Sequence, residues 1–508
     1  MPRFPKLPIL LMTGLTAVLR APGLFANSFQ ADEALFATWA REIAIWRDPL
    51  LAMQPVDKPP LLFYLQALFY PLFGPVEFAA RWPNWIASLL LVPLTGILVW
   101  KLYRRSETAV LAAALVALFP LTIQFSATAF IDPLLTFWLI AAFTAVSGQK
   151  TSWAGVLFGL ALLTKYQAIL FLPLLLGLGW IFDWRLVRWA RGLVGLLPLL
   201  VVLFVWEFAR SGHFLLWQNQ ISNFGGVRLS SSWELWPRFL AWADLWQTAV
   251  SPLIFFLFIP AVGWFIIQTC QVSPAIPTPR HNRPDRSWQA DRLLLIFILG
   301  YGLFHWLFAI PVWDRYLLPL LPLLAILLAC AYDELLVQLP SLSPILRFRG
   351  AIVILILLSI SASWAARNGR TPLGSSSQSD EGAAEIAAAL ADAPYGTVLY
   401  DHWFSWQWRY HLFDKRVFVS WFPHANALAT DLTAFGQDGA PRYLALPNTA
   451  VAQPIIRTVQ EAGFTLTAVA QSNQIILYKI ISPQSTQRPQ RNNQKISALS
   501  AVKTGAVA

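Results

Sequence analysis

The residues best suited to chemistry lie in one segment, residues 26–81. It contains the adjacent carboxylates Asp32 and Glu33, and further on Asp57 and Lys58, which precede two prolines. Successive prolines disfavour helix for the residue before each and remove two backbone donors, so Lys58 should lie on a stiff, extended segment. A carboxylate can take a proton from a hydroxyl, and a fixed cation can stabilise an anion that develops charge. The segment therefore carries groups for acid–base chemistry beside an anionic substrate.

Other charges stand where apolar runs begin or break. Asp132 precedes Pro133 at the start of one run, Lys165 interrupts a second, and Asp314-Arg315-Tyr316 precedes a third, while Arg81 closes the first segment. Ionisable groups at membrane depth are costly unless they face a wet cavity or one another. If these positions converge with residues 26–81, they form a cavity that holds both carboxylates and cations.

The acids also have structural interpretations. Asp32 and Glu33 suit the first turn of an amphipathic helix over 34–46, where the helix dipole favours negative charge. Asp132 followed by proline has the pattern of a helix N-cap. Both interpretations stay open from the sequence.

The cations have alternatives as well. Lys165 could extend its ammonium group to the membrane interface, and Arg81 and Arg315 could form structural ion pairs with neighbouring acids. His213 and His305 are expected to be satisfied structural residues. His402 and His411, with the aromatic residues of 403–408, are an alternative acceptor-binding surface.

Composition places these residues in a membrane protein. Of the 508 residues, 57% are hydrophobic and only 12% are charged, and the mean hydropathy is +0.54. Soluble domains carry about 25% charged residues, so too little polar surface is present for a soluble particle of this size. We expect an all-α polytopic domain with about eleven spans. The predicted spans are near Leu7–Phe25, Trp82–Tyr103, Ala109–Phe125, Pro133–Ser147, two short spans within Trp153–Phe182, Leu193–Trp206, Thr248–Thr269, Leu293–Ile310, Tyr316–Tyr332 and Ala351–Trp364.

The charge distribution predicts the orientation. The net charge is +11, and with these spans the basic loops all fall on one side of the membrane. Cytoplasmic loops retain Lys and Arg, so the basic excess indicates a cytoplasmic N-terminus rather than nucleic-acid binding. The two cysteines, Cys270 and Cys330, provide neither a disulfide framework nor a zinc site.

The composition changes after Arg367 to a soluble pattern. Helices are predicted at 381–390 and 453–461, and strands at 397–400, 416–419, 464–469 and 474–480. The expected organisation is a transmembrane domain over 1–366 that includes the outer loop 26–81, a small α/β extracytoplasmic domain over 367–481, and a disordered tail over 482–508.

The ordered motifs resemble those of the GT-C integral-membrane glycosyltransferases, in the bacterial branch of the protein O-mannosyltransferases and the lipid A aminoarabinose transferase. The resemblance covers most of residues 27–329. It rests on Ala31-Asp32-Glu33, Asp57-Lys58-Pro59-Pro60-Leu61, Glu77-Phe78-Ala79-Ala80-Arg81-Trp82-Pro83, Asp132-Pro133-Leu134-Leu135, Gly159-Leu160-Ala161-Leu162-Leu163-Thr164-Lys165 and Arg315-Tyr316-Leu317-Leu318-Pro319-Leu320-Leu321-Pro322.

The resemblance implies transfer of a sugar from a polyprenyl-phosphate carrier to an acceptor on the outer face of a bacterial inner membrane. Asp32 then matches the general base, with Glu33 beside it as the second catalytic candidate. The groups that would hold the donor phosphate are Lys58, Arg81, Lys165, Arg315 and Tyr316, and the supporting acids are Asp57 and Asp132.

Two departures from that pattern concern a metal ion. Asp57 stands where the lipid A branch often has Glu, and residues 217–220 read Trp-Gln-Asn-Gln where that branch often has an acid beside His or Asn. A divalent metal therefore stays an open possibility, and no other cofactor is expected.

The chemistry also follows from the residue types. The phosphate leaving group gains negative charge as the glycosidic bond breaks, so fixed cations stabilise the transition state more than the ground state. A single base with no enzyme nucleophile predicts inversion at the sugar carbon. The expected partners are the lipid-linked donor, the bilayer, and a lipid, protein or glycan acceptor that attacks through a hydroxyl or phosphate. A lipid-linked sugar flippase is the alternative, although transporters tend to have internal repeats and midplane sites.

Overall fold

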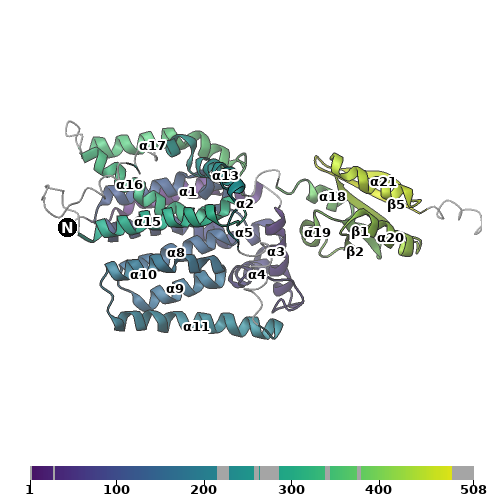
Figure 1. Ribbon diagram of the computed structural model, residues 1–508, viewed down its shortest axis with the longest axis horizontal. Coiled ribbons are helices and arrows are strands. Elements are labelled where there is room, and N and C mark those ends of the chain that lie inside the picture. The colour runs from purple at the N-terminus through teal and green to yellow at the C-terminus, as the bar shows by residue number, and fades with distance from the viewer. Residues whose placement is uncertain are drawn as a thin grey trace, which may run out of the picture. The chain divides into compact units, whose positions relative to one another are not determined.

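The structure is a computed structural model that describes residues 3–26, 29–213, 228–256, 263, 285–337, 344–374 and 379–482. The chain forms two compact units. The helical unit comprises Met1–Asn27 and Trp39–Ser377, and the α/β unit comprises Ser28–Thr38 and Gln378–Ala508. The elements of both are labelled in Figure 1.

The helical unit is built from apolar helices that pack side by side (Figure 1). Its helices are α1 (Lys6–Arg20), α2 (Gly23–Ala26), α4 (Leu61–Phe73), α5 (Glu77–Tyr103), α6 (Ser106–Leu118), α7 (Pro120–Ser126), α8 (Asp132–Ser147), α9 (Thr151–Thr164), η1 (Tyr166–Phe171), α10 (Leu172–Ile181), α11 (Leu186–Ser211), α13 (Ser232–Val250), α15 (Asp285–Leu307), η2 (Asp314–Tyr316), η3 (Leu318–Leu320), α16 (Leu321–Val337) and α17 (Pro344–Arg367). Helix α3 (Ala31–Ala44) begins in the α/β unit and continues past Trp39.

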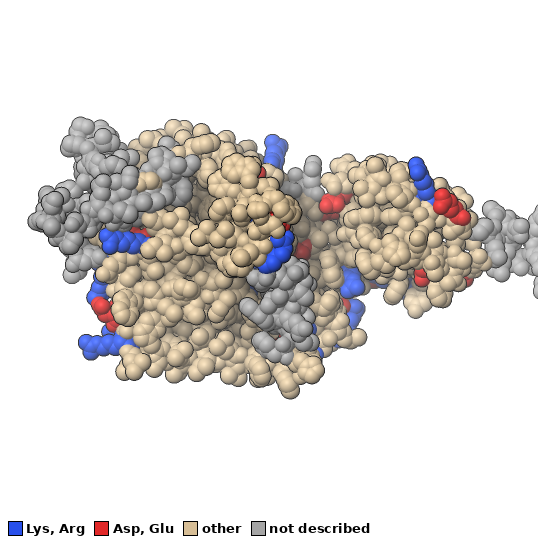
Figure 2. All heavy atoms as spheres, in the orientation of Figure 1, with Lys and Arg blue, Asp and Glu red and all other residues tan. Residues whose placement is uncertain are grey.

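The predicted membrane protein is confirmed, but the predicted number of about eleven spans is not. Among the described residues, six helices are long and apolar enough to cross a membrane. The pair α6 and α7, bent by 60° at Phe119, would make a seventh, and four shorter apolar helices remain. The predicted span Thr248–Thr269 lies largely outside the described residues. On the face in Figure 2, Lys, Arg, Asp and Glu are sparse over the helical unit and lie mainly toward its ends.

Small residues allow two of these helices to approach closely. A Cβ atom added to Gly155 of α9 would overlap the carbonyl oxygen of Gly192 in α11, and one added to Gly195 would overlap that of Ser152. Membrane helices gain little from hydrophobic contact with each other, since lipid is equally apolar, so close backbone packing becomes a main source of stability. Glycine is thus required on both sides of this interface.

The α/β unit contains a five-stranded sheet with the order β2-β1-β3-β5-β4. Strands β1 (Thr397–Asp401), β2 (Val417–Trp421) and β3 (Arg442–Pro447) are parallel, whereas β5 (Ile475–Ile481) pairs antiparallel with both β3 and β4 (Thr465–Gln471). Separate apolar cores cover its two faces, one with α18 (Ala383–Ala389) and α19 (Ser405–His411), the other with α20 (Ala425–Phe435) and α21 (Gln453–Glu461). The sequence predicted four of these strands and the helices α18 and α21, but missed β3, α19 and α20.

Candidate active site

A buried ion pair lies where three apolar elements meet. Lys165 occupies the break between α9 and η1 in an extended conformation, with φ −158° and ψ 134°. Its Nζ lies 2.6 Å from Oδ1 of Asp132 at the start of α8. Lys165 is 4% exposed and Asp132 is fully buried. The interpretation of Lys165 as an interfacial side chain is therefore wrong, because the nearby carboxylate compensates its charge inside the protein.

The N-cap interpretation of Asp132 is also wrong, because its carboxylate pairs with Lys165. Helix α8 begins at Asp132 itself, and the N-cap residue, Ile131, makes no side-chain cap hydrogen bond. The Asp132 carboxylate is directed to Lys165 and not to the backbone N–H groups of the helix. A sequence rule for helix starts cannot detect an ion pair between residues 33 positions apart.

The segment that leads to Asp132 is fixed by two amides. Nδ2 of Asn84 in α5 donates to the carbonyl oxygens of Thr128 and Phe130, at 2.7 and 2.5 Å. Nε2 of Gln66 in α4 donates to the carbonyl oxygen of Ala129 at 3.4 Å. These buried amides satisfy backbone acceptors that a helix break would otherwise leave without partners. The sequence analysis missed them, since nothing in their spacing distinguishes them from ordinary polar residues in apolar helices.

Two cations share one set of aromatic rings. The Nζ atom of Lys165 lies 4.9 Å from the ring centroid of Tyr316, and the guanidinium carbon of Arg315 lies 4.1 Å from that of Trp313. Trp313 and Tyr316 themselves pack at 5.7 Å. Aromatic faces attract cations, so these rings orient both side chains without neutralising their charges. The structure therefore brings Lys165, Arg315 and Tyr316 together, as predicted.

Hydrogen bonds to Asp314 hold the turn that carries Arg315. The Asp314 carboxylate accepts hydrogen bonds from the backbone N–H groups of Arg315 and Gly374, both at 2.6 Å. Asp314 thus fixes the backbone beside Arg315, a role that the predicted ion pair between them does not include.

Lys58 contributes a further positive charge. It forms an ion pair with Asp57, and both side chains are about 15% exposed, so the pair is shielded but accessible to solvent. The charges of Lys58 and Arg315 both act on Lys165, so each of them lies within electrostatic range of its ammonium group. Arg81 is buried and its guanidinium donates to the carbonyl oxygen of Gly23 at 3.3 Å.

The two N-terminal acids lie in the α/β unit. Helix α3 begins at Ala31, three residues before the predicted start, so that Asp32 and Glu33 both stand in its first turn. Oε1 of Gln30 accepts from the backbone N–H of Asp32 at 2.7 Å, and Oε2 of Glu33 accepts from that of Gln30 at 3.2 Å. The remaining predicted site residues belong to the helical unit.

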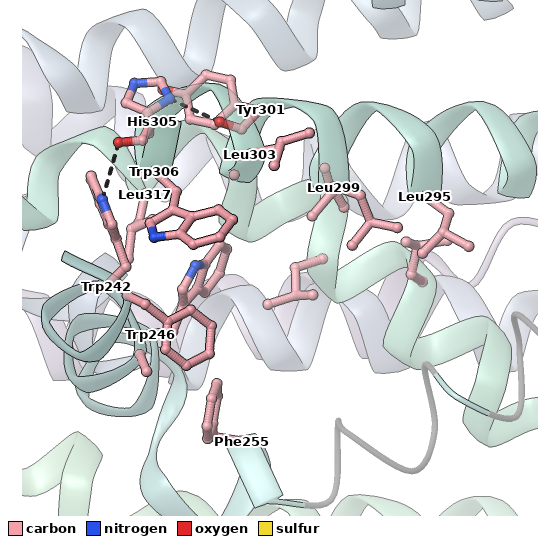
Figure 3. A pocket seen from close by; sticks show the side chains of 16 residues that line it. Trp242, Trp246, Phe255, Leu295, Leu299, Tyr301, Leu303, His305, Trp306 and Leu317 are labelled. Atoms are coloured by element: carbon pink, nitrogen blue, oxygen red, sulfur yellow. Dashed lines mark hydrogen bonds between the residues drawn. The ribbon is translucent and has the colours of Figure 1, made fainter. Parts of the chain in front are cut away.

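An apolar cavity of about 390 Å³ lies between α13, α15 and α16 (Figure 3). Its wall includes Trp242, Leu299, Leu303 and Tyr301, and Leu299 and Leu303 are about half exposed on the outer surface of α15. These two side chains therefore both line the cavity and reach the surface of the helical unit.

Aromatic rings in contact with one another lead from the wall of this cavity to Lys165. His305 stacks on Tyr301 at 4.1 Å, its Nδ1 bonds to the carbonyl oxygen of Tyr301 at 2.9 Å, and its ring lies 5.5 Å from that of Tyr316. Tyr316 in turn packs on Lys165. His305 is satisfied, as predicted, but it also lines the cavity. The rings of His305 and Tyr316 thus connect the wall of the apolar cavity with Lys165.

An arginine joins two walls of the cavity. The guanidinium of Arg238 in α13 donates to four backbone carbonyl oxygens, two in the last turn of α15 and two just after it, over distances of 2.6–3.1 Å. The acceptors belong to residues 305, 306, 308 and 310. The last carbonyls of a helix have no partners within it, so Arg238 satisfies them and fixes α13 to α15.

The possible metal ion finds no ligand set in the described residues. They contain no group of three or more His, Cys, Asp and Glu side chains that could hold one. Residues 217–220, on which the sequence comparison depended, lie outside the described part of the chain.

Known proteins match part of the chain in sequence. A family model described as dolichyl-phosphate-mannose-protein mannosyltransferase matches residues 57–206, which include Asp57, Lys58, Arg81, Asp132 and Lys165. An undecaprenyl phosphate-alpha-4-amino-4-deoxy-L-arabinose arabinosyl transferase from Pseudomonas aeruginosa strain LESB58 is 27% identical over 230 residues, 40% of this chain and 42% of that protein. The protein of the same name from Enterobacter sp. strain 638 is 25% identical, over 42% and 43% of the two chains. The chain thus spans less than half the length of these curated relatives.

Solved structures match nearly the whole chain in fold. ArnT from Cupriavidus metallidurans bound to undecaprenyl phosphate has a TM-score of 0.63 at 16% identity, covering 93% of this chain and 97% of that one. The oligosaccharyltransferase AglB from Archaeoglobus fulgidus, in complex with an inhibitory peptide and a dolichol-phosphate, has a TM-score of 0.51 at 10% identity, covering 92% and 75%. These comparisons confirm the predicted resemblance to the GT-C fold, in the branch of the aminoarabinose and protein mannosyl transferases.

Proposed function

We propose that this protein transfers a sugar from a polyprenyl-phosphate carrier to an acceptor at the outer face of the membrane, with inversion at the sugar carbon. The observation that carries the proposal is the position of Lys165. Its buried ammonium group packs on the Tyr316 ring, which contacts the His305 ring in the wall of an apolar cavity, and the charges of Lys58 and Arg315 act on it. An amphiphile with an isoprenoid chain and an anionic head has the matching chemistry.

The cations act on the leaving group. As the bond between the sugar and the phosphate breaks, the phosphate oxygen gains negative charge, and Lys165, Arg315 and Lys58 stabilise it in place. Asp132 holds the Lys165 ammonium group in position, and the Tyr316 ring limits its movement. Because these groups are oriented before the reaction, little reorganisation is needed in the transition state.

Asp32 is assigned as the base. It takes the proton of the acceptor hydroxyl while that oxygen attacks the sugar carbon from the face opposite the phosphate, which gives inversion. Such a base contributes roughly 10²–10⁴-fold to a rate. Glu33 is the second candidate, and its bond to the Gln30 backbone favours a role in forming the helix start.

The topology belongs to the same proposal. The N-terminus lies in the cytoplasm, and the acids of α3, the cations and the domain over 367–481 lie on the outer side of a bacterial inner membrane. The transmembrane domain extends over residues 1–366 and includes the outer loop 26–81, whereas the tail predicted over 482–508 lies, beyond Ser482, outside the described residues. Support comes from the basic loops, which fall on one side when the spans predicted from the sequence are used.

Asp32→Asn tests the proposal against the flippase alternative. Membranes that contain the wild-type protein should consume a radiolabelled polyprenyl-phosphate sugar and release the free carrier phosphate, whereas Asp32→Asn at equal expression should lower this rate about 10²–10⁴-fold. Glu107→Gln, an acid in the first turn of α6, is the matched control and should retain the wild-type rate. Movement of intact donor across the bilayer, unaffected by Asp32→Asn, would instead establish a flippase.

A further inference from the structure

The start of helix α3 is part of the same compact unit as the C-terminal domain. Residues 28–38 group with Gln378–Ala508 and not with the helices that precede and follow them in the chain. Asp32 and Glu33 are therefore carried by the α/β unit, although more than 300 residues separate them from it in sequence.

An aromatic contact contributes to this connection. The ring of Phe29 meets the ring of Tyr410 in α19 edge to face, with centroids 4.7 Å apart and an interplanar angle of 72°. Phe29 is fully buried and Tyr410 is 4% exposed. A buried phenylalanine two residues before the start of a helix helps to fix the direction in which the chain enters that helix.

The contact is supported from the domain side. The buried carboxylate of Asp401, at the end of β1, accepts hydrogen bonds from the backbone N–H of Phe404 at 3.0 Å and from Oγ of Ser405 at 2.8 Å. These bonds hold the first residues of α19, and the fully buried Trp408 anchors the middle of that helix. Tyr410 is therefore presented on a rigid element and not on a loop.

The contact is also connected to the acids. Gln30 follows Phe29, and its side chain and backbone bond to the Asp32 backbone and the Glu33 carboxylate. Hydrogen bonds within the first turn keep these residues in one geometry, but they do not determine how that turn is oriented. Phe29 supplies that orientation, because its ring is fixed against the domain.

We propose that the C-terminal domain is a positioning element for the acids of α3, and that Phe29 and Tyr410 are its positioning residues. This inference rests on the proposed function in one respect, since it takes Asp32 to be the base of the reaction. A misplacement of about 1 Å can cost about 10²-fold in rate, so a base on the first turn of a helix benefits from external fixation.

Full-length Phe29→Ala in lipid nanodiscs tests the proposal. Hydrogen exchange of the amides at 30–38, followed by mass spectrometry, should become at least about tenfold faster than in the wild type if the ring fixes this turn. The value of kcat should fall about 10–100-fold with KM for the donor nearly unchanged, because the proposed phosphate-binding cations lie in the helical unit. Phe29→Leu refills the space with an apolar side chain. It should therefore restore most of the slow exchange at 30–38 and most of the wild-type kcat.

Two further variants make the result specific. Tyr410→Ala should reproduce the faster exchange at 30–38, whereas Trp421→Ala removes an aromatic ring that is 59% exposed on the same domain and should change neither quantity. Unchanged exchange at 30–38 in both Phe29→Ala and Tyr410→Ala would overturn the positioning role whatever the activity. Faster exchange in a protein whose wild type transfers no sugar would overturn the proposed function and leave the structural connection intact.

Discussion

Removing one member of the Lys165–Asp132 pair should destabilise the protein more than removing both. Lys165→Met leaves a buried carboxylate uncompensated, which costs about 3–5 kcal/mol, while an apolar pair of similar volume avoids that penalty. Chemical denaturation in detergent should give a lower free energy of unfolding for Lys165→Met than for Lys165→Met/Asp132→Leu, and neither variant should transfer sugar. A double variant as unstable as the sum of the two single changes would contradict this account.

The exposed pair of Arg286 and Asp183 is the matched control for that prediction. Their side chains are 52% and 71% exposed. Solvent screens such a pair, so Arg286→Gln should change the free energy of unfolding by less than about 1 kcal/mol.

At the scale of residues, the sequence predicted the charged groups better than their partners. Lys165, Arg315 and Tyr316 do come together, because charged side chains in apolar helices are stable only where they pair with one another or face a polar interior. The ion-pair partner of Asp132 could not be predicted from the sequence, since it depends on which helices pack together. Asn84 and Gln66 were missed because a buried amide that supports a loop has no pattern in sequence.

At the scale of elements, glycines allow α9 and α11 to pack. Gly155→Ala and Gly195→Ala each place a methyl group against a carbonyl oxygen of the other helix, and the backbones must separate. Overpacking of this kind costs about 1–3 kcal/mol. Thermal unfolding in detergent should therefore occur at a lower temperature in both variants.

Gly14→Ala in α1 provides the comparison. A Cβ at this position meets no atom within 4 Å, so the change only removes backbone freedom from the unfolded chain. It should unfold at or slightly above the wild-type temperature. If Gly14→Ala and Gly155→Ala lowered the unfolding temperature equally, separation of α9 and α11 would not be the cause of the destabilisation.

The elements themselves were predicted unevenly. The break at Lys165 was anticipated, because a lysine within an apolar stretch cannot remain in lipid. The strand β3 was missed, since Arg442–Pro447 begins with a charged residue and ends with proline, although the strand lies at the centre of the sheet. Arg442 is accommodated there because its guanidinium bonds to Tyr400 and Asp438, contacts that only the folded sheet supplies.

At the scale of the whole molecule, the cavity should select donors by chain length. Gly302 lines it, and a Cβ at this position meets no atom within 4 Å, so Gly302→Leu fills the space without disturbing the backbone. We expect KM for a long-chain polyprenyl donor to rise about tenfold, which corresponds to about 1.4 kcal/mol of lost binding. A donor with two isoprene units should be affected less.

Gly300→Leu is the control for that change. Gly300 lies two residues earlier in α15, is also open to added atoms, and is not among the residues that line the cavity. It should leave KM for both donors unchanged. The same rise in KM for long and short donors in Gly302→Leu would argue against a chain-binding role for the cavity.

The overall architecture was largely predictable, because composition, apolar runs and ordered motifs all indicate the same membrane fold. The grouping of residues 28–38 with the C-terminal domain was not predictable. It includes the packing contact between Phe29 and Tyr410, two aromatic residues that are individually ordinary in a chain with 14% aromatics.

The four hydrogen bonds of Arg238 have a mechanical consequence for lipid entry. Since they join α13 and α15 at the end near residues 305–310, these helices cannot separate there without breaking several bonds at once. A lipid chain that enters between these two helices should therefore do so away from residues 305–310.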